Sequence, residues 1–294
     1  MRLLRDVFAR KTMFLMTLVP SALVLIIIFG LFEKSKALLG LKSLGSLLFS
    51  ATWSPLKGEF GFFPFIMGTL WVTAVALVIA VPVSLFTAIY LSEYAPKVFR
   101  EFAKPVIDLL AGIPSVVFGV WGIMVVVPFV GNVLAPLFGV YSSGYSILAG
   151  GIVLAIMIFP TIIHVSLEVF ASIPVALRET SLSLGATRWE TVHHVVLRKG
   201  AQGILAASIL GLSRAFGETM AVLMVVGNVP LVPKSLFQPG YPLPALIANN
   251  YGEMMSIPLY DSALMLAALV LLVVVLVSSI LGRWILVKAE RRAE

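Results

Sequence analysis

Six long apolar runs constrain the fold of this chain more than any other feature. They cover residues 13–32, 65–91, 106–130, 145–170, 201–226 and 263–287. Each is at or above the roughly 20 residues that an α-helix needs to cross the hydrocarbon core of a bilayer. The chain is 60% hydrophobic and 12% charged, whereas soluble domains are roughly 45–50% apolar. We therefore predict an all-α, polytopic membrane protein, with about six transmembrane helices in a single domain over residues 1–294.

The first apolar run follows four positive charges, at Arg2, Arg5, Arg10 and Lys11, as a secretory signal would. It is too long for the apolar region of a signal peptide, and no small-x-small cleavage site follows it. We therefore expect a retained first helix. The sequence contains no cysteine, which excludes disulfides and thiolate metal sites.

Positive charges are concentrated in alternate loops. Of the 21 Lys and Arg residues, 15 lie before the first run or in segments 92–105, 171–200 and 283–294. Cytosolic loops carry the excess of Lys and Arg in membrane proteins. The distribution predicts that both termini and these loops are cytosolic. It also explains the net charge of +7 without a nucleic-acid partner.

The loops on the outer side differ in composition. Residues 33–64 include a leucine-rich part, 37–49, which could form an interfacial helix or a loop resting on the membrane. Residues 131–144 are uncharged and form either a short turn or a segment that dips into the membrane. Residues 227–262 contain six prolines, so only 243–255 is expected to form a short helix. These segments offer surface to an extracytoplasmic partner.

Arg214 and Glu218 lie inside the apolar run 201–226. Ionised groups at that depth cost from about 3 to more than 10 kcal/mol, so they usually have a function. A spacing of four predicts that both lie on one helix face, and Arg214 would lie about 20 Å from the cytosolic end, near the midplane. We predict that Arg214 contacts a passing anion and that Glu218 neutralises it when the path is empty. The alternative is a buried ion pair that fixes helix packing.

Other polar groups lie near the ends of the runs. Asp108, His164 and Glu168 could brace the loops or form a cytosolic gate. His193 and His194 are adjacent, so they point to different helix faces, and no third ligand is evident. No metal site is predicted.

The cytosolic loop 171–200 is amphipathic on both sides of Gly185. This pattern predicts two short helices joined at the glycine, forming a knob that could sit in a groove of a partner. The residues predicted to form this coupling loop surface are Arg178, Glu179, Gly185, Ala186, Thr187, Arg188 and Trp189.

This loop resembles the "EAA" loop of ABC-importer permeases, whose pattern is Glu-Ala-Ala, three residues, Gly, nine residues, then Ile-x-Leu-Pro. The residues at matching positions are Glu179, Gly185, Val195 and Leu197. The departures are Thr180 and Ser181 in place of the alanines and Arg198 in place of the proline.

Further segments occur in the order found in one family. They are Phe60-Gly61, Gly68-Thr69-Leu70, residues 91–96, residues 109–115 and residues 213–221. Together they resemble the permeases of Pst-type phosphate importers over residues 53–287, and Met220-Ala221-Val222 is similar to the PstC-like rather than the PstA-like subunit.

The resemblance implies a type I ABC-importer permease fold in a prokaryotic inner membrane. It implies that the chain moves phosphate with a second, PstA-like permease subunit, two cytosolic ATPases and an extracytoplasmic phosphate-binding protein. The matching arginine and glutamate, Arg214 and Glu218, belong to the translocation path that the family implies. Independently, the sequence has no Gly-Lys dipeptide and hence no Walker A loop. We expect a transporter subunit rather than an enzyme, without a cofactor of its own, with ATP and Mg bound by the partner ATPase.

Three alternatives remain open. The chain could be a permease for another oxyanion such as molybdate or sulfate. It could be an ion-coupled carrier that works without ATP, which would need more titratable groups along its path. It could also be a membrane-embedded enzyme, although no nucleophile and base lie at workable spacing.

Overall fold

All six apolar runs contribute long helices to the computed structural model, which describes residues 2–252 and 257–290. Within these described residues, six helices are long and apolar enough to cross a membrane. They comprise Phe8–Leu39, Phe63–Tyr94, Ser115–Leu137, Ile147–Ser172, Arg188–Gly217 and Tyr260–Ile285. The all-α, polytopic prediction is confirmed.

Four spans are single helices, or nearly so. Their elements are α1 (Arg2–Leu39), α3 (Phe63–Ile89), α8 (Ile147–Ser172) and α14 (Tyr260–Glu290). At the end that the positive charges predict to be cytosolic, which is called the inner end below, α3 continues through a π-helical turn, Tyr90–Tyr94. At its start α8 is capped by Ser146, whose side chain accepts a hydrogen bond from the backbone N–H of Ala149 at 3.2 Å. Such a cap satisfies one backbone donor that the first turn leaves without a partner.

The third span differs from the predicted 106–130. Its residues divide between an inner helix and an outer series of short helical pieces that ends at Leu137. These elements are α4 (Lys97–Gly112), α5 (Ser115–Trp121), π-turn Gly122–Val126, α6 (Val127–Phe129), π-turn Val130–Leu134 and α7 (Ala135–Leu137). The break has a local cause, because Pro114 excludes the helical conformation at Ile113, which is extended with ψ 129°.

The fifth span also differs from the continuous helix predicted over 201–226. It divides into α11 (Leu197–Gly217) and α12 (Met220–Val225). Glu218 is extended between them, with φ −74° and ψ 127°. The prediction that Arg214 and Glu218 share one helix face is therefore wrong.

Helices α3 and α8 form the centre of the bundle and pack over most of their length. Glycines on α8 allow the close approach. Gly150 faces Val72, and a Cβ at Gly151 would overlap the side chain of Val75. Small residues at such crossings are a common device of membrane helices, because dispersion contacts require close backbones.

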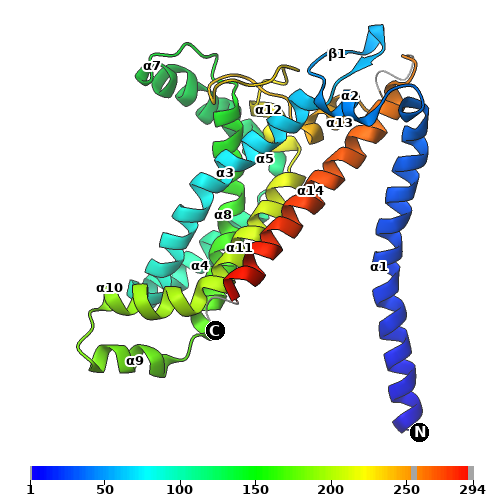
Figure 1. Cartoon of the computed structure of the whole chain (residues 1–294). Coiled ribbons are helices and arrows are strands. Elements are labelled where there is room, and N and C mark those ends of the chain that lie inside the picture. The colour runs from blue at the N-terminus through cyan, green and yellow to red at the C-terminus, as the bar shows by residue number, and fades with distance from the viewer. Residues whose placement is uncertain (1, 253–256, 291–294) are drawn as a thin grey trace.

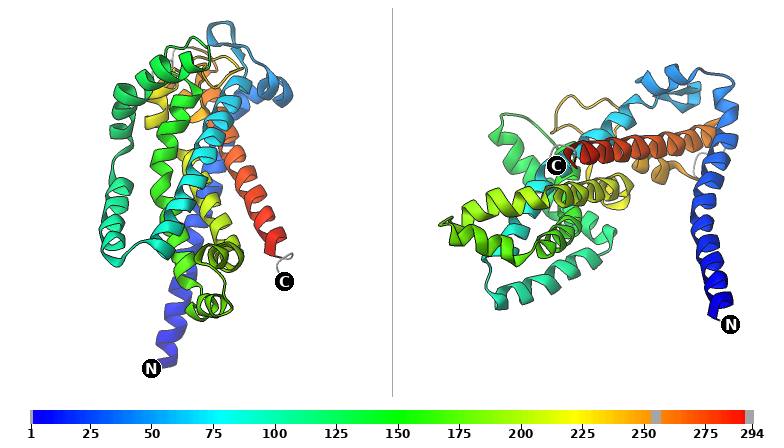
Figure 2. Two further views of the ribbon diagram at one scale, coloured as in Figure 1. Left: turned by 90° about the vertical axis from the view of Figure 1, so that its left-hand side faces the viewer. Right: turned by 60° about the horizontal axis from the view of Figure 1, so that its bottom comes forward.

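Helix α1 stands apart from the bundle along most of its length, as Figure 1 and the right-hand panel of Figure 2 show. Its most apolar window has no buried residue within this chain. It joins the bundle near its outer end, where Leu38 is fully buried beside α14. Apolar side chains exposed along a membrane span are compatible with lipid or with another membrane helix.

The outer end is built from short elements. They are α2 (Leu44–Phe49), the antiparallel strands β1 (Trp53–Ser54) and β2 (Glu59–Phe60), the 3-10 turn Pro55–Lys57, and α13 (Leu243–Asn250). Leu38 and Leu47 are buried in the outer core, so the leucine-rich segment packs inward and does not form one interfacial helix. The expected helix 243–255 ends at Asn250, and residues 253–255 lie outside the described part of the chain.

The opposite end carries the segment predicted to couple to a partner. There α9 (Val175–Ser183) and α10 (Arg188–Thr191) project below the bundle. Helix α1 begins and α14 ends at this same end of the molecule (Figure 1). The cations at 291 and 292 in the predicted cytosolic tail lie outside the described residues.

Candidate functional site

The turn between α9 and α10 is fixed by the glycine that the sequence predicts. Gly185 has φ +88°, a left-handed conformation that glycine adopts without the Cβ penalty. Its N–H donates to the carbonyl of Leu182 at 3.0 Å, and the N–H of Ala186 donates to that of Ser181 at 3.3 Å. These two bonds form the Schellman motif that ends many helices.

The next helix begins immediately, with a capping box. The backbone N–H of Glu190 donates to Thr187 Oγ1 at 3.2 Å, and Glu190 Oε2 accepts from the N–H of Thr187 at 2.7 Å. This arrangement satisfies two backbone donors at the start of α10. However, α10 is not a separate short helix, because it continues through the π-turn Val192–Val196 into α11. Only the first of the two predicted short helices is short.

Buried apolar side chains attach the coupling loop to the bundle. Val192 and Val196 pack with Ala88 and Ile89 of α3 and with Phe170 of α8. All five are buried. The loop is therefore held against the inner ends of the second and fourth spans.

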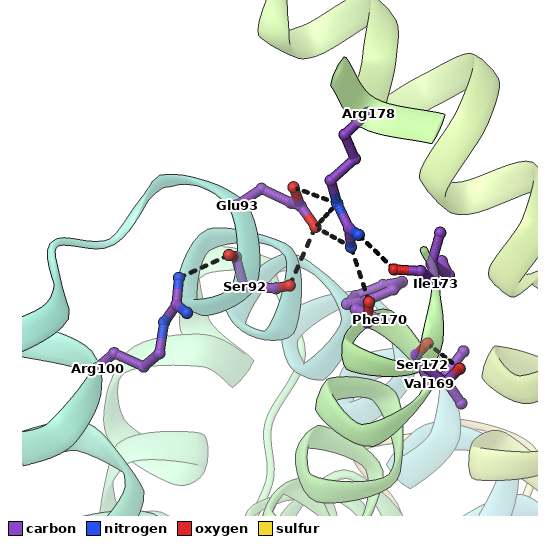
Figure 3. Close-up of polar contacts among 8 residues, drawn as sticks. All are labelled: Ser92, Glu93, Arg100, Val169, Phe170, Ser172, Ile173 and Arg178. Carbon is purple, nitrogen blue, oxygen red and sulfur yellow. Dashed lines mark hydrogen bonds and ion pairs between the residues drawn. The ribbon is translucent and has the colours of Figure 1, made fainter. Parts of the chain in front are cut away.

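An ion pair reinforces this attachment (Figure 3). Arg178 of α9 contacts Glu93, in the π-turn after α3, with Nη2 2.9 Å from Oε1 and Nε 3.2 Å from both oxygens. Arg178 also donates to the carbonyls of Phe170 at 2.7 Å and Ile173 at 2.7 Å. The side chains of Arg178 and Glu93 are only 17% and 13% exposed. One guanidinium therefore joins α9 to the ends of both α3 and α8.

This geometry changes the interpretation of Arg178 and adds a residue that sequence reasoning missed. Arg178 was predicted on the docking surface, but its side chain faces inward. Glu93 was noted only as part of a resemblance. The sequence offered little signal, because Glu93 is one of two acidic residues in the segment 92–105. Ser92 supports the pair, since its Oγ donates to Glu93 Oε1 at 3.0 Å while its carbonyl accepts from Arg100 at 2.7 Å.

The other predicted coupling residues lie at the surface. Glu179, Thr187, Arg188 and Trp189 are exposed, as is Gly185, whereas Ala186 is half-buried. The side chain of Trp189 is 52% exposed, and Leu184 beside the turn is 83% exposed. Exposed apolar groups on a rigid, polar-rimmed projection are typical of protein docking surfaces.

Arg214 lies in the last turn of α11, and its side chain is exposed in this chain. Its Nη1 donates to Thr161 Oγ1 of α8 at 2.6 Å. Among the described residues, no ion pair joins it to Glu218. The predicted neutralisation of Arg214 by Glu218 is thus not formed in this conformation.

Glu218 instead holds the break in the fifth span. Its Oε1 accepts from the backbone N–H groups of Thr219 at 3.1 Å and Ala221 at 3.3 Å. A carboxylate at the start of a helix accepts hydrogen bonds from N–H groups that have no partner within the helix. Its negative charge also interacts favourably with the positive end of the helix dipole. Glu218 therefore stabilises the start of α12. This helix begins at Met220, three residues after α11 ends at Gly217.

Of the three polar residues predicted near the span ends, two are in contact. Asp108 Oδ1 of α4 lies 2.8 Å from His164 Nε2 of α8, whereas Glu168 is exposed nearer the inner end of α8. The rings of His193 and His194 are 4.7 Å apart and nearly perpendicular. Within the described residues no three His, Asp or Glu side chains cluster as metal ligands would.

Comparison with known proteins gives a family and close relatives. The model of the family "Binding-protein-dependent transport system inner membrane component" matches residues 80–292. The chain is 37% identical over 261 residues to the phosphate transport system permease protein PstC of Xylella fastidiosa, covering 84% of this chain and 80% of that protein. It is 40% identical over 240 residues to a probable ABC transporter permease protein, YqgH, of Bacillus subtilis, covering 81% and 76%.

Solved structures support the fold. A bacterial alginate ABC transporter in complex with its periplasmic protein contains a chain that aligns with a TM-score of 0.65 at 19% identity, covering 96% of both chains. An inward-facing methionine ABC transporter aligns with a TM-score of 0.58 at 21% identity, covering 76% of this chain and 93% of that one. At these identities the likeness concerns the fold alone.

Proposed function

Because the chain belongs to the family of binding-protein-dependent transport system inner membrane components, we propose that it is the permease subunit of an ATP-driven importer that moves inorganic phosphate into the cytoplasm by alternating access. Relatives described as phosphate permeases share 35–37% identity over 84% of the chain. The observation that carries the proposal is the exposed guanidinium of Arg214 on a membrane-spanning helix. Such a charge cannot be left against acyl chains without a large cost.

The chemistry of Arg214 suits an oxyanion. Phosphate near neutral pH carries one to two negative charges and oxygens that match the planar fork of a guanidinium. Arg214 uses Nη1 to contact Thr161, and a guanidinium has five N–H donors. Donors therefore remain for a passing anion, while Thr161 orients the group. Glu218 then limits how strongly the site attracts an anion, through its negative charge four residues away in sequence.

ATP hydrolysis requires other chains, because this sequence contains no phosphate-binding Gly-Lys loop. We propose two cytosolic ATPase subunits that bind ATP and Mg, a second, PstA-like permease subunit, and an extracytoplasmic phosphate-binding protein. The exposed surface around Leu184 and Trp189 supports docking of an ATPase. The positive charges predict that this end, with both termini, faces the cytoplasm of a prokaryotic cell with the chain in its inner membrane.

The coupling loop has a defined route into the bundle. Motion imposed on α9 passes through the Arg178–Glu93 pair to the inner end of α3 and through the carbonyls of Phe170 and Ile173 to α8. Since α3 and α8 pack along their length, they move together. The second half of the loop is continuous with α11, which carries Arg214. Both halves of the loop are therefore linked to the helices that line the proposed path.

Phosphate uptake by bacterial cells that lack their own phosphate importers tests the proposal when the chain is produced with its partner subunits. We expect uptake of radiolabelled phosphate that excess sulfate or molybdate does not inhibit. Stronger inhibition by either of these than by unlabelled phosphate would assign another oxyanion. Uptake that persists with a catalytically inactive ATPase partner would assign an ion-coupled carrier instead.

A further inference from the structure

Three polar residues form a stripe on one face of α8. Thr161, His164 and Glu168 are spaced by three and four residues, so they lie above one another on the helix. The intervening residues Ile162 and Ile163 are buried in the bundle. The stripe is therefore turned away from the apolar core.

Two residues of this stripe, Thr161 and His164, contact polar side chains on other helices. Thr161 accepts from Arg214 of α11 at 2.6 Å, and His164 contacts Asp108 of α4 at 2.8 Å. These two contacts, Arg214–Thr161 and His164–Asp108, lie one turn apart on α8 and join it to two other helices. Glu168 continues the stripe toward the inner end of α8.

Two residues of the stripe lie at a depth along α8 where polar side chains are unusual in a membrane helix. Counted from Ile147 at 1.5 Å per residue, Thr161 lies about 21 Å, His164 about 26 Å and Glu168 about 32 Å into the helix. A hydrocarbon core of roughly 30 Å places the first two inside the membrane and the third near its inner boundary. The side chains of Asp108 and His164 are nevertheless 64% and 37% exposed in this chain. Polar side chains at this depth face water or protein rather than lipid.

We propose that Thr161, His164 and Glu168 line the inner half of the anion path that starts at Arg214, and that the contact between His164 and Asp108 is its inner gate. This inference rests on the proposed function. In the present conformation the contact joins α4 to α8 below Arg214. An anion leaving Arg214 toward the cytoplasm meets His164 next, and its exit requires Asp108 to move aside.

The backbone around Asp108 allows such a movement. Helix α4 ends at Gly112, and Ile113 and Pro114 are both extended before α5 begins. A hollow of about 660 Å³ lies beside this break, lined by Pro105, Asp108, Leu109, Gly112, Ile113 and Pro114. The break gives α4 a hinge next to α5, and a swing there would also move Ile107 away from its buried cluster with Leu91, Ala95 and Ile163. Separation from Asp108 frees the His164 ring to donate to a phosphate oxygen, while the negative charges of Asp108 and Glu168 weaken binding there and favour release of the anion.

The absence of cysteine from the sequence allows a direct test on the assembled complex. Single variants Thr161→Cys, His164→Cys and Glu168→Cys are treated with a charged, membrane-impermeant thiosulfonate from the cytosolic side, in the nucleotide-free and ATP-trapped states. Labelling is read as the mass shift of this chain. Ile162→Cys, on the same helix but with a side chain buried in the core between α3, α8 and α11, is the matched control.

We expect Thr161→Cys to react in one state and Ile162→Cys in neither. Glu168→Cys should react in both states, and so should His164→Cys, because this variant itself lacks the gate contact. Adding Asp108→Asn should raise the labelling rate of Thr161→Cys in the less reactive state about tenfold, since losing the carboxylate charge weakens the hydrogen bond with His164 by about 1.4 kcal/mol. Glu101→Gln is the control on α4, where Glu101 is exposed and lies 3.9 Å from the exposed Lys97. If Asp108→Asn fails to co-purify with its partners, His164→Ala removes the contact from the α8 side.

The inference is overturned if Thr161→Cys and His164→Cys stay unreactive in both states while Glu168→Cys reacts. Its gate is overturned if Asp108→Asn changes labelling no more than Glu101→Gln does. Cysteine labelling measures whether the path is accessible to water, and it can be done without phosphate. Phosphate uptake is measured separately, so a wrong cargo and a wrong path give different results.

Discussion

Arg214→Gln should lower ATP-driven phosphate uptake about 10- to 100-fold while the complex still assembles. A hydrogen bond to a charged group contributes about 1.5–3 kcal/mol, and each 1.4 kcal/mol is roughly a factor of ten. The loss falls on transport because Arg214 supplies charge where an anion crosses. The substitution should change the stability of the fold little, because the Arg214 side chain is exposed. Its one hydrogen bond to another described side chain goes to Thr161.

Initial rates of uptake at saturating phosphate, normalised to co-purified complex, check this expectation. Arg214→Lys should retain an intermediate rate, because lysine keeps the charge but lacks the planar fork. Thr161→Val removes the hydroxyl that orients Arg214 and should lower uptake less than Arg214→Gln. Normal uptake by an assembled Arg214→Gln complex would show that Arg214 has a packing role only.

Arg178→Gln is the second variant with a large expected effect. Removing one member of a buried ion pair costs about 3–5 kcal/mol, because the other charge is left without its partner. Here the loss also releases α9 from the inner ends of α3 and α8. We expect less phosphate moved per ATP hydrolysed and a lower melting temperature of the purified complex.

The two members of the pair should not be equivalent. Glu93→Gln removes one charge but leaves Arg178 bonded to the carbonyls of Phe170 and Ile173, so its effect should be smaller than that of Arg178→Gln. The exchanged pair Glu93→Arg with Arg178→Glu should fail to restore coupling, because a carboxylate at 178 cannot donate to these carbonyls. Glu101→Gln serves as control for charge in the same inner region. Full rescue by the exchanged pair would show that net charge alone matters.

Apolar runs of about 20 residues predicted that six helices would be long enough to span a membrane, because membrane thickness sets helix length. The glycine at 185 was also predictable, since the chain must reverse between two amphipathic segments and glycine tolerates the left-handed conformation found there. Hydropathy could not locate the breaks at Pro114 and Glu218. A broken apolar run has the same mean hydropathy as a continuous one, and only local backbone chemistry ends the helix.

The contacts between distant residues were less predictable. Arg178 and Glu93 are 85 positions apart, and Arg214 and Thr161 are 53 apart. Neither pair has a spacing that a single helix would reveal. The spacing of four between Arg214 and Glu218 was misleading, because the extended backbone at Glu218 turns its carboxylate to the next helix. The roles of Arg214 and Glu218 in transport stay predictions.

The most direct test measures phosphate influx and ATP hydrolysis in the same proteoliposomes containing the purified complex and the binding protein. Our account predicts influx only when ATP is hydrolysed, and loss of that influx in Arg214→Gln liposomes of equal protein content. Influx driven by a proton or sodium gradient without ATP, or ATP-driven influx unchanged by Arg214→Gln, would contradict it.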